Sequence, residues 1–424
     1  MRFRFKQPLP LSLLRQPQAA SASAKFRSVS QHSSFGVAFD IDGVILHGAN
    51  PIGNSPRALR KFYNDSGSLK IPFLFLTNGR YSESSYVSSC ASIWNLTAYL
   101  CVEKQDSLLL YPSGRKQVKY HRLIVGGGIP ESRRALELSD ILGVKILPSQ
   151  VVQGHSPFST LLKRYENEFI VATGKGEPAV VMSEYGFKRV VSLDEYASHF
   201  SNIDPVAQYK RWTTIQESNC SKNSDKIIHH DYSKNVKAVF VVSDPVDWGR
   251  DIQVLCDILT SGGIPGKKDW HQPPLYFAAD DLQYQAAFPS ERLGMGAFRI
   301  ALESVFNRIH DKPLEFTCFG KPNPFVFRNA ETILAHLLQT CSPGDVGTGN
   351  GDSGSPSFRT LYMIGDNPLV DIKGAQQAGY PWFSILTRTG VFRQRENHTK
   401  YPADLVVDTV EDAVAFILNR EDAL

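Results

Sequence analysis

The chain has 424 residues, of which 42% are hydrophobic and 21% charged, which is enough apolar content to bury at least one large core and suggests two compact units. Its formal net charge is +4, and no window approaches the roughly 18 apolar residues that span a bilayer, so we expect a soluble protein without a transmembrane segment. The six cysteines form no CxxC pair and no metal-ligand spacing, which argues against disulfides and zinc.

Residues 1–35 carry six basic residues and no acid, and they are rich in serine with scattered Leu and Phe. This composition is typical of an organelle transit peptide, and the prolines that interrupt Leu9 to Leu14 exclude a secretory signal. A disordered basic tail is the alternative interpretation. Without those six residues the chain has 40 basic against 42 acidic residues, so nucleic acid is not an expected partner.

Three apolar, β-prone runs each end in a polar cluster. They cover residues 37–39, 71–76 and 361–364, and helix-like segments at 55–63 and 371–378 follow the first and the third. Strands that alternate with helices predict an α/β fold with a parallel sheet covered on both faces. Ligands bind such sheets at the carboxyl ends of the strands, which is where the polar clusters lie.

The middle of the chain has strand candidates of its own at 169–172, 238–242 and 275–278, and a helix candidate at 249–259. These indicate a second α/β unit inserted into the first. The Gly-rich stretch 343–357 is interpreted as a solvated loop without a chemical role.

Asp40 and Asp42 follow the first strand and are separated by one residue, so both side chains point to the same side of an extended chain. Together they can share one small hard cation and one substrate. Gly43 permits the sharp turn that follows. On its own this pattern also fits an acid-rich turn or part of a calcium loop.

Two further clusters supply groups that suit a phosphoryl oxygen. Thr77 and Asn78 end the second strand and offer a hydroxyl and an amide, although a strand-terminating turn uses the same residues. Lys321 lies in the Pro-bracketed segment Gly-Lys-Pro-Asn-Pro before a helix; the alternative is an ordinary surface lysine.

Asp366 ends the third strand and Asp371 follows five residues later at a helix start. An aspartate at a strand end can complete a magnesium site, whereas the second aspartate could be an N-cap of the helix. All four clusters occur in the chain order that a single site would use, and chance assembly of all four is improbable.

The segments FDIDGVI, FLTNG, GKPNP and MIGDNPLVDIKGA resemble the four motifs of the haloacid dehalogenase-like (HAD) hydrolase superfamily, in the same order. A long unit between the second and third motifs resembles the type IIA cap of one subclass, at about residues 175–274. The segments Ser243-Asp244-Pro245 and Asp247 to Asp251 are similar to the mitochondrial branch named for cat eye syndrome critical region protein 5.

The resemblance implies that Asp40 is the nucleophile that forms an aspartyl-phosphate, and that Asp42 is the general acid and base. It implies that Mg²⁺ is held by Asp40, the backbone carbonyl of Asp42 and Asp366, with Asp371 as an outer ligand. Thr77, Asn78 and Lys321 would bind the phosphoryl oxygens. Without substrate, the lysine is expected to pair with Asp40 or Asp366. Asp281, His155 and Arg292 could approach the site, but a structural hydrogen bond is the preferred interpretation of each.

The expected division is a transit peptide at 1–35, a Rossmann-like core at 36–174 and 275–424, and a cap at 175–274. Residues 80–126 depart from the resemblance, because deleting them restores a continuous TNGGG segment. We interpret this segment as a retained intron or gene-model error; a genuine elaboration beside the site is the alternative.

The function expected from these residues is a magnesium-dependent phosphatase of a small phosphorylated metabolite in an organelle. Leader composition and the branch resemblance favour the mitochondrion over the plastid. The alternatives are a catalytically weak scaffold protein that keeps the fold, and a hydrolase of glycerophospholipid metabolism. Association into a homodimer is left open.

Overall fold

The computed structural model describes residues 35–79, 127–210, 235–267, 271–286, 288–341 and 358–423. Residues 1–34 of the predicted leader, the segment 80–126 and the Gly-rich loop 343–357 therefore lie outside the described residues, whereas Phe35, the last residue assigned to the leader, begins a strand. All described elements belong to the compact unit Ser33–Leu424. Among the described helices, none combines the length and the apolarity needed to cross a membrane.

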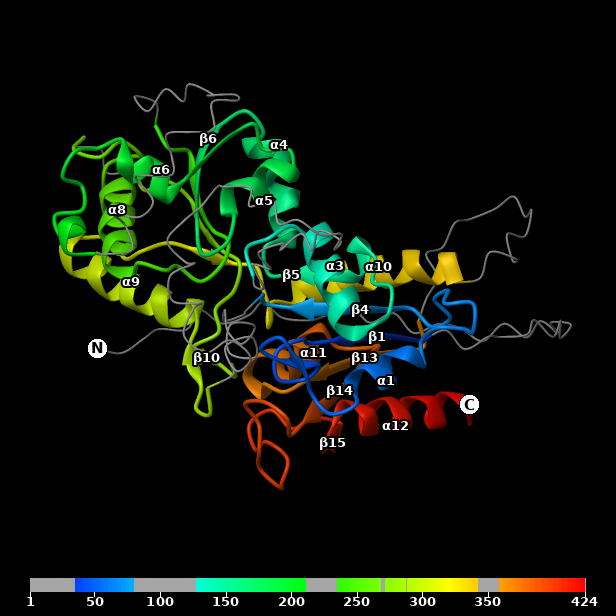
Figure 1. Cartoon of the computed structure of the whole chain (residues 1–424). Coiled ribbons are helices and arrows are strands. Elements are labelled where there is room, and N and C mark those ends of the chain that lie inside the picture. Colours follow the sequence, from blue (N-terminus) through cyan, green and yellow to red (C-terminus); the bar gives the residue numbers. More distant parts are fainter. Residues whose placement is uncertain are drawn as a thin grey trace, which may run out of the picture. The chain divides into compact units, whose positions relative to one another are not determined.

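A six-stranded parallel sheet carries the polar strand ends (Figure 1). Its spatial order places β13 and β4 on either side of β1, so the three strands that end in polar clusters are neighbours. Along the sheet, the strands are β15 (Leu405–Val407), β14 (Trp382–Thr387), β13 (Thr360–Gly365), β1 (Phe35–Phe39), β4 (Phe73–Thr77) and β5 (Val151–Gln153).

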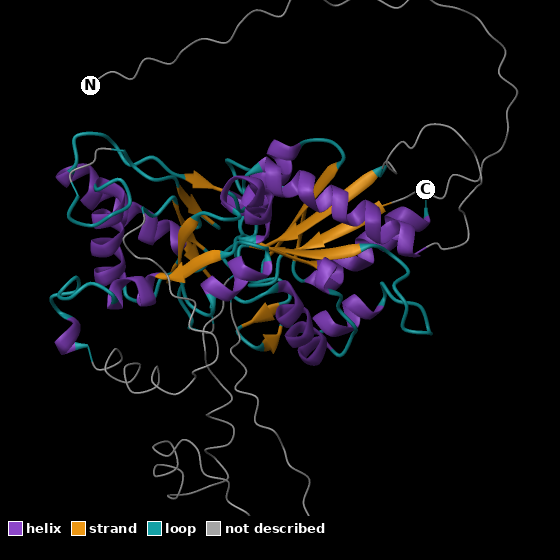
Figure 2. Ribbon diagram, turned by 90° about the horizontal axis from the view of Figure 1, so that it is seen from above, coloured by secondary structure: helices purple, strands orange, loops and turns teal. Residues whose placement is uncertain are grey.

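Helices cover both faces of this sheet (Figure 2). Alternate residues of β1 point to opposite faces, so Val37 and Phe39 pack in one apolar cluster and Ala38 in another. The first cluster is completed by α1 (Ser55–Arg60), α3 (Glu131–Leu142) and α12 (Val410–Asp422). The second is completed by α10 (Pro324–Cys341) and α11 (Lys373–Ala378). The α/β fold with a parallel sheet covered on both faces is confirmed.

A second parallel sheet has five strands in the order β12-β9-β8-β6-β7. They are β12 (Thr317–Cys318), β9 (Leu275–Phe277), β8 (Ala238–Val241), β6 (Phe169–Thr173) and β7 (Arg189–Ser192). Because β8 pairs with β6 on one side and β9 on the other, this sheet draws strands from both sides of the interval 175–274 suggested for the cap. The sequence reveals an apolar strand but not the sheet in which it pairs.

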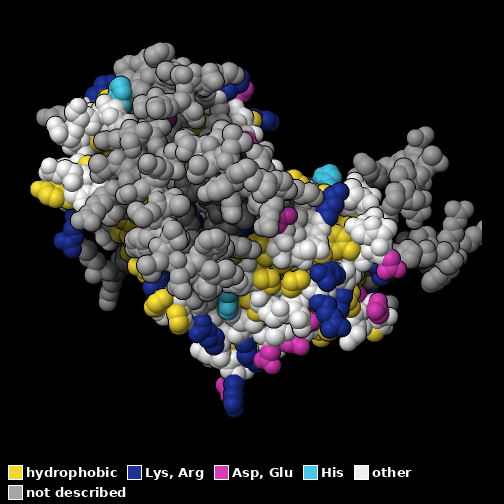
Figure 3. All heavy atoms as spheres, in the orientation of Figure 1, with side chains coloured by type: hydrophobic (Ala, Val, Ile, Leu, Met, Phe, Trp, Pro, Cys, Tyr) yellow, Lys and Arg dark blue, Asp and Glu magenta, His cyan; other side chains and the backbone are white. Residues whose placement is uncertain are grey.

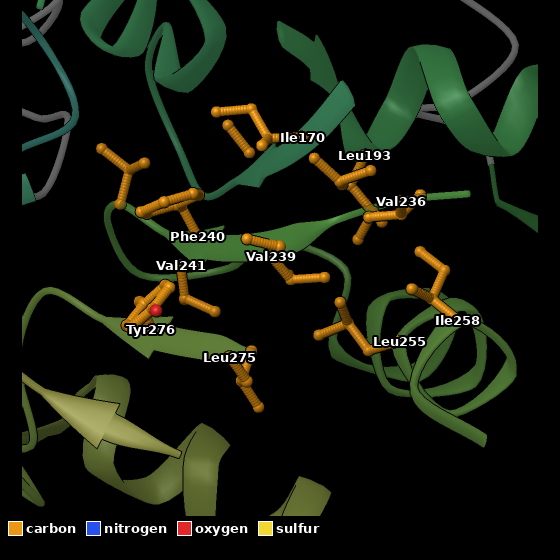
Figure 4. Packing of buried hydrophobic residues seen from close by; sticks show 14 of the residues in the cluster. Ile170, Leu193, Val236, Val239, Phe240, Val241, Leu255, Ile258, Leu275 and Tyr276 are labelled. Carbon is orange, nitrogen blue, oxygen red and sulfur yellow. The ribbon is translucent and has the colours of Figure 1, made fainter. Parts of the chain in front are cut away.

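The core of this second unit lies between its sheet and its helices, which are α4 (Leu162–Tyr165), α5 (Pro178–Glu184), α6 (Leu193–Ser198), α8 (Trp248–Thr260) and α9 (Met295–Ile309). Figure 4 shows Val239 turned toward Leu255 and Ile258 of α8, while Phe240 points to the other face. There Phe240 packs against Tyr165 and further aromatic rings. Two apolar faces require helices on both sides, as in the first sheet.

Two short antiparallel hairpins lie outside the two large sheets. One joins β2 (Leu46–His47) to β3 (Asn50–Pro51), and the other joins β10 (Gln283–Tyr284) to β11 (Arg292–Leu293). On the face seen in Figure 3, Lys and Arg side chains are interspersed with Asp and Glu over the six-stranded unit.

Asp251 of α8 is a buried carboxylate whose protonation is linked to stability. Its Oδ1 accepts hydrogen bonds from Arg250 Nε at 3.0 Å and Nη2 at 2.7 Å. Burial raises the pKa of Asp251 to about 6, against the opposing effect of Arg250. Since the pKa of Asp251 is higher in the folded than in the unfolded state, this group contributes its whole share to the free energy of unfolding at low pH. That contribution is lost as pH rises through about 6.

We therefore expect the free energy of unfolding of the wild-type chain to fall by about 1.3 kcal/mol more than that of Asp251→Asn between pH 5 and pH 7. Denaturant titrations at the two pH values measure this difference. Asp140→Asn, on the exposed face of α3, is the matched control and should follow the wild type. Parallel pH dependence in the wild type and Asp251→Asn would contradict the assignment.

The two residues that flank the segment 80–126 lie next to each other in the six-stranded unit. Gly79 and Gly127 are so close that a Cβ on Gly127 would lie 3.3 Å from the Cα of Gly79 and 2.1 Å from its carbonyl oxygen. Consecutive Cα atoms in a chain are about 3.8 Å apart. The fold on either side is therefore compatible with a chain that passes almost directly from Gly79 to Gly127.

We expect the chain lacking residues 80–126 to unfold within about 4 °C of the full chain, because the excision leaves both flanking segments in place. Thermal unfolding followed by circular dichroism measures the shift. A second variant that replaces the segment by a Gly-Ser pair relieves any strain at the junction. Failure of both variants to fold would show that residues 80–126 are part of the stable structure.

Candidate active site

Three of the four polar clusters of the sequence lie at the carboxyl ends of neighbouring strands, and the fourth, which contains Lys321, lies between β12 and α10. Asp40 follows β1, Thr77 ends β4, and Asp366 follows β13. Because these strands are parallel and adjacent, their last residues lie at one edge of the sheet. One cavity at this edge is lined by all seven predicted site residues: Asp40, Asp42, Thr77, Asn78, Lys321, Asp366 and Asp371.

A buried lysine joins two of the carboxylates. The Lys321 Nζ donates to Asp40 Oδ1 at 2.9 Å and to Asp371 Oδ1 at 2.7 Å, and the lysine is only 1% exposed. Burial by itself lowers the pKa of Lys321, but the charges of Asp371 and Asp40 raise it above its ordinary value. The ammonium therefore stays charged between two acids.

The prediction that Lys321 pairs with Asp40 or Asp366 is confirmed for Asp40. Lys321 also pairs with Asp371, which was not predicted. A turn of π-helix at Pro368–Ile372 brings the Asp371 carboxylate back under Gly365, where it also accepts a hydrogen bond from the Asn367 backbone at 3.0 Å. The five-residue spacing in the sequence does not reveal this turn.

Asp366 completes a cluster of three buried carboxylates. Ligand atoms of Asp40, Asp366 and Asp371 lie within 4.8 Å of one another. Burial, followed by the charges of Asp40 and Asp371, raises the pKa of Asp366 well above its ordinary value. Burial likewise raises the pKa of Asp371 to about 7. Such crowding is unfavourable for three ionised acids and is relieved by a bound cation.

Glycine is required beside Asp366. Gly43 has a φ of +85°, and a Cβ there would lie 2.5 Å from Asp366 Oδ2. The Asp366 carboxylate also accepts the Val391 backbone N–H at 2.6 Å. These contacts fix its position at the end of β13.

Thr77 and Asn78 approach the cavity from β4 and differ in how their polar atoms are used. Thr77 Oγ1 accepts the Gly79 N–H at 3.1 Å, which leaves the hydroxyl hydrogen as a donor. Asn78 Nδ2 donates to both oxygens of Asp281, at 3.0 and 2.9 Å, and to the Lys321 carbonyl at 3.0 Å. Its Oδ1 accepts the Lys321 N–H at 2.9 Å. Asn78 thus positions Lys321 and Asp281; its contact with a phosphoryl oxygen stays a prediction.

The three residues named as outer candidates have different places. Asp281 lines the cavity and also makes the structural hydrogen bonds with Asn78. His155 is buried beside Tyr185, and burial lowers the pKa of its imidazole. The Arg292 guanidinium donates a hydrogen bond to the Ser290 hydroxyl and lies over the ring of Phe288. Neither of these two is among the lining residues.

Several lining residues were not predicted from the sequence: Gln283, Tyr284, Gln285, Asn367, Val370 and Val391. The first three belong to one short strand and its end, which have no periodic apolar pattern. Asn367 and Val370 lie between Asp366 and Asp371, inside the segment MIGDNPLVDIKGA, and Val391 lies in the loop that follows β14. No signal in the sequence would have marked Gln283, Tyr284, Gln285 or Val391 as part of a site.

Comparison with known proteins shows which proteins this chain resembles. The HAD-hydrolase-like family model matches residues 318–413, the part of the chain that contains Lys321, Asp366 and Asp371. A mitochondrial hydrolase of Saccharomyces cerevisiae is 28% identical over 410 residues, which cover 93% of this chain and 98% of that protein.

A Schizosaccharomyces pombe protein in which a CMP-forming cardiolipin synthase is fused to a mitochondrial hydrolase is 32% identical over 311 residues. These cover 72% of this chain and 48% of the fusion, so the chain spans about half of that relative. A solved structure of a possible sugar phosphatase of the HAD superfamily from Cytophaga hutchinsonii has a TM-score of 0.52 at 12% identity. It covers 89% of this chain and 94% of its own, and it is similar in fold.

Proposed function

This chain is a hydrolase of the haloacid dehalogenase-like superfamily, and from that premise we propose that it is a magnesium-dependent phosphatase that hydrolyses a small organic phosphate through an aspartyl-phosphate on Asp40. The observation that carries the proposal is the pairing of Lys321 with Asp40 and Asp371 next to Asp366. An ammonium and three acids at one strand edge suit the transfer of a phosphoryl group.

The residues present fit a magnesium ion. Mg²⁺ prefers oxygen ligands, and the cluster of Asp40, Asp366 and Asp371 offers three buried carboxylates at close range. We assign the metal to Asp40, Asp366 and the backbone carbonyl of Asp42, with Asp371 as an outer ligand. When bound, Mg²⁺ would supply positive charge between the carboxylates and the phosphate.

In the proposed reaction an Asp40 carboxylate oxygen attacks phosphorus, and the bond between phosphorus and the ester oxygen breaks. Asp42 gives its proton to the departing oxygen. The Asp42 carboxylate then takes a proton from a water molecule, which attacks phosphorus, releases phosphate and restores Asp40. The Lys321 ammonium and the Thr77 hydroxyl hold the phosphoryl oxygens while their charge shifts.

We place this activity in the mitochondrion. The composition of residues 1–35 supports an import signal, and the two fungal relatives carry mitochondrial names. Fusing residues 1–35 to a fluorescent protein tests the location in cells. Plastid import of the fusion would favour the alternative, and a diffuse signal would contradict both.

A second candidate is a hydrolase of glycerophospholipid metabolism. The observation that favours it is the Schizosaccharomyces pombe relative, whose name joins a cardiolipin synthase to the hydrolase. The substrate would then be a phosphorylated headgroup or lipid precursor. Phosphate release from lipid phosphates in vesicles, compared with soluble phosphomonoesters, distinguishes the two candidates.

The proposed function is tested by phosphate release from a panel of small phosphoesters, with Mg²⁺ and with EDTA. We expect turnover that requires Mg²⁺ and disappears in Asp40→Asn. No turnover of any soluble or lipid phosphate would favour a scaffold protein that keeps the fold without catalysis.

A further inference from the structure

Both units of the fold contribute to the lining of the active-site cavity. Residues 281–285, which follow β9 of the second sheet, supply Asp281, Gln283, Tyr284 and Gln285. The proposed nucleophile and metal ligands reach the same cavity from the strand ends of the six-stranded sheet. A substrate bound in the cavity therefore meets side chains from both units.

The loop after β14 supports the proposed metal ligand Asp366. The Val391 N–H donates to the Asp366 carboxylate at 2.6 Å, and the Phe392 N–H donates to the Asp366 carbonyl at 3.0 Å. Gly390 packs so closely against the same carboxylate that a Cβ would not fit there. Residues 390–392 therefore lie directly against one side of the site.

Arg393 joins this loop to the second unit. Its Nε donates to the Gly390 carbonyl at 2.9 Å, and its Nη2 donates to Gln285 Oε1. Gln285 is buried, and its Nε2 donates in turn to the carbonyls of Ala286 and Phe288, both at 2.8 Å. Because a guanidinium is planar and rigid, one side chain fixes the distance between the loop after β14 and the end of β10.

Resting on the proposed phosphatase activity, we propose that Arg393 is a positioning residue that holds residues 281–285 where they contact the leaving group of the bound ester. Arg393 acts through Gln285, because Gln285 lines the cavity and Arg393 does not. A wall that is ordered before the substrate enters loses less conformational entropy when the substrate binds. Binding of the ester therefore depends on the bond between Arg393 and Gln285.

The catalytic groups do not depend on this bond. Asp40 is held by Lys321, and Asn78 ties Asp281 to the six-stranded unit by two further hydrogen bonds. Removal of the Arg393 guanidinium should therefore loosen residues 281–285 without releasing them. The expected effect is weaker binding of the leaving group with little change in the chemical step.

Hydrogen–deuterium exchange of the full chain tests the link itself. In peptides that cover residues 281–294, we expect exchange to be at least about threefold faster in Arg393→Met and in Gln285→Met than in the wild type. The double variant should exchange no faster than the faster single variant, because both substitutions remove the same bond. Arg395→Met, which removes an exposed arginine from the same loop, is the matched control and should exchange like the wild type.

Steady-state kinetics with Mg²⁺ and an ester that the chain turns over test the consequence for binding. Arg393→Met should raise KM about five- to tenfold and leave kcat within about twofold, as expected for one lost hydrogen bond to a charged group. In the Gln285→Met background the same change should raise KM by less than about twofold. Inhibition by orthovanadate, which resembles the phosphoryl group and has no leaving group, should be unchanged in Arg393→Met.

The outcomes separate this inference from the function on which it rests. Exchange that is unchanged in Arg393→Met would overturn the link, whatever the activity. An unchanged KM, or weaker inhibition by orthovanadate in step with a raised KM, would overturn the positioning of the leaving group and leave the phosphatase standing. Absence of Asp40-dependent turnover of every ester in the panel would overturn the proposed function and, with it, the role of Arg393 in catalysis.

Discussion

Asp40→Asn is expected to lower phosphate release by a factor on the order of 10⁴ or more, while the unfolding temperature stays close to that of the wild type. An amide oxygen is a poor nucleophile, so the first bond to phosphorus cannot form. The amide oxygen of the new asparagine can still accept the hydrogen bond from Lys321 Nζ. The substitution also removes the negative charge of residue 40 that lies close to Asp366. Steady-state phosphate release and thermal unfolding measure the two parts of this result.

Asp65→Asn is the matched control for Asp40→Asn, because it makes the same chemical change in an exposed loop. It should retain full activity. Residual activity of Asp40→Asn above a few per cent of the wild type would show that another group attacks phosphorus. A large fall in unfolding temperature would show that the loss of activity is structural.

Lys321→Met is expected to destabilise the protein by about 3–5 kcal/mol in EDTA, because it leaves buried Asp40 and Asp371 without their shared cation. Saturating Mg²⁺ should recover about 2–3 kcal/mol, since the ion binds the same carboxylates in the folded state. Activity should stay low even with Mg²⁺, because the phosphoryl oxygens lose the ammonium.

Denaturant unfolding of Lys321→Met in EDTA and in Mg²⁺ measures this effect. Lys312→Met removes an exposed lysine from the loop before β12 and should unfold like the wild type in both conditions. If Lys321→Met were as stable as the wild type in EDTA, the ammonium would not be balancing the buried acids. If Mg²⁺ gave no recovery, the three carboxylates would not form the metal site.

The strands that hold the site could be predicted because each is a short apolar run that ends in polar residues. The runs ending before Asp40, Thr77 and Asp366 became β1, β4 and β13 with shifts of one or two residues at their ends. The predicted helix at 249–259 became α8, which is one residue longer at each end. In these strands the apolar sequence pattern matches the burial of the side chains, because both sheets are covered by helices on two faces.

Lys321 shows where the sequence stops being informative. Its link to Asp40 was expected from the resemblance of its motif to the HAD family, but its second partner depends on the π-helical turn that places Asp371. Such a turn is set by packing under Gly365 and has no local sequence pattern of its own.

The part of the cavity lined by Gln283, Tyr284 and Gln285 was also beyond the sequence, whereas Asp281 was named as a residue that could approach the site. Asp281 and Gln283 lie around a two-residue strand, and they reach the site only because Asn78 and Arg393 of the six-stranded unit hold the segment 281–285 over it. Contacts between residues about 200 positions apart in the chain are not encoded in any local period. Specificity therefore has to be argued from the assembled cavity.

The central claim is that Asp40 itself accepts the phosphoryl group, and chemical trapping tests it most directly. The full chain with Mg²⁺ would be mixed with a substrate that it turns over, quenched in acid, reduced with borohydride and digested for mass spectrometry. Because borohydride reduces an acyl phosphate to an alcohol, the account predicts homoserine in place of Asp40, and no such product without substrate. Reduction at another carboxylate, or an unmodified Asp40 under conditions of measured turnover, would contradict it.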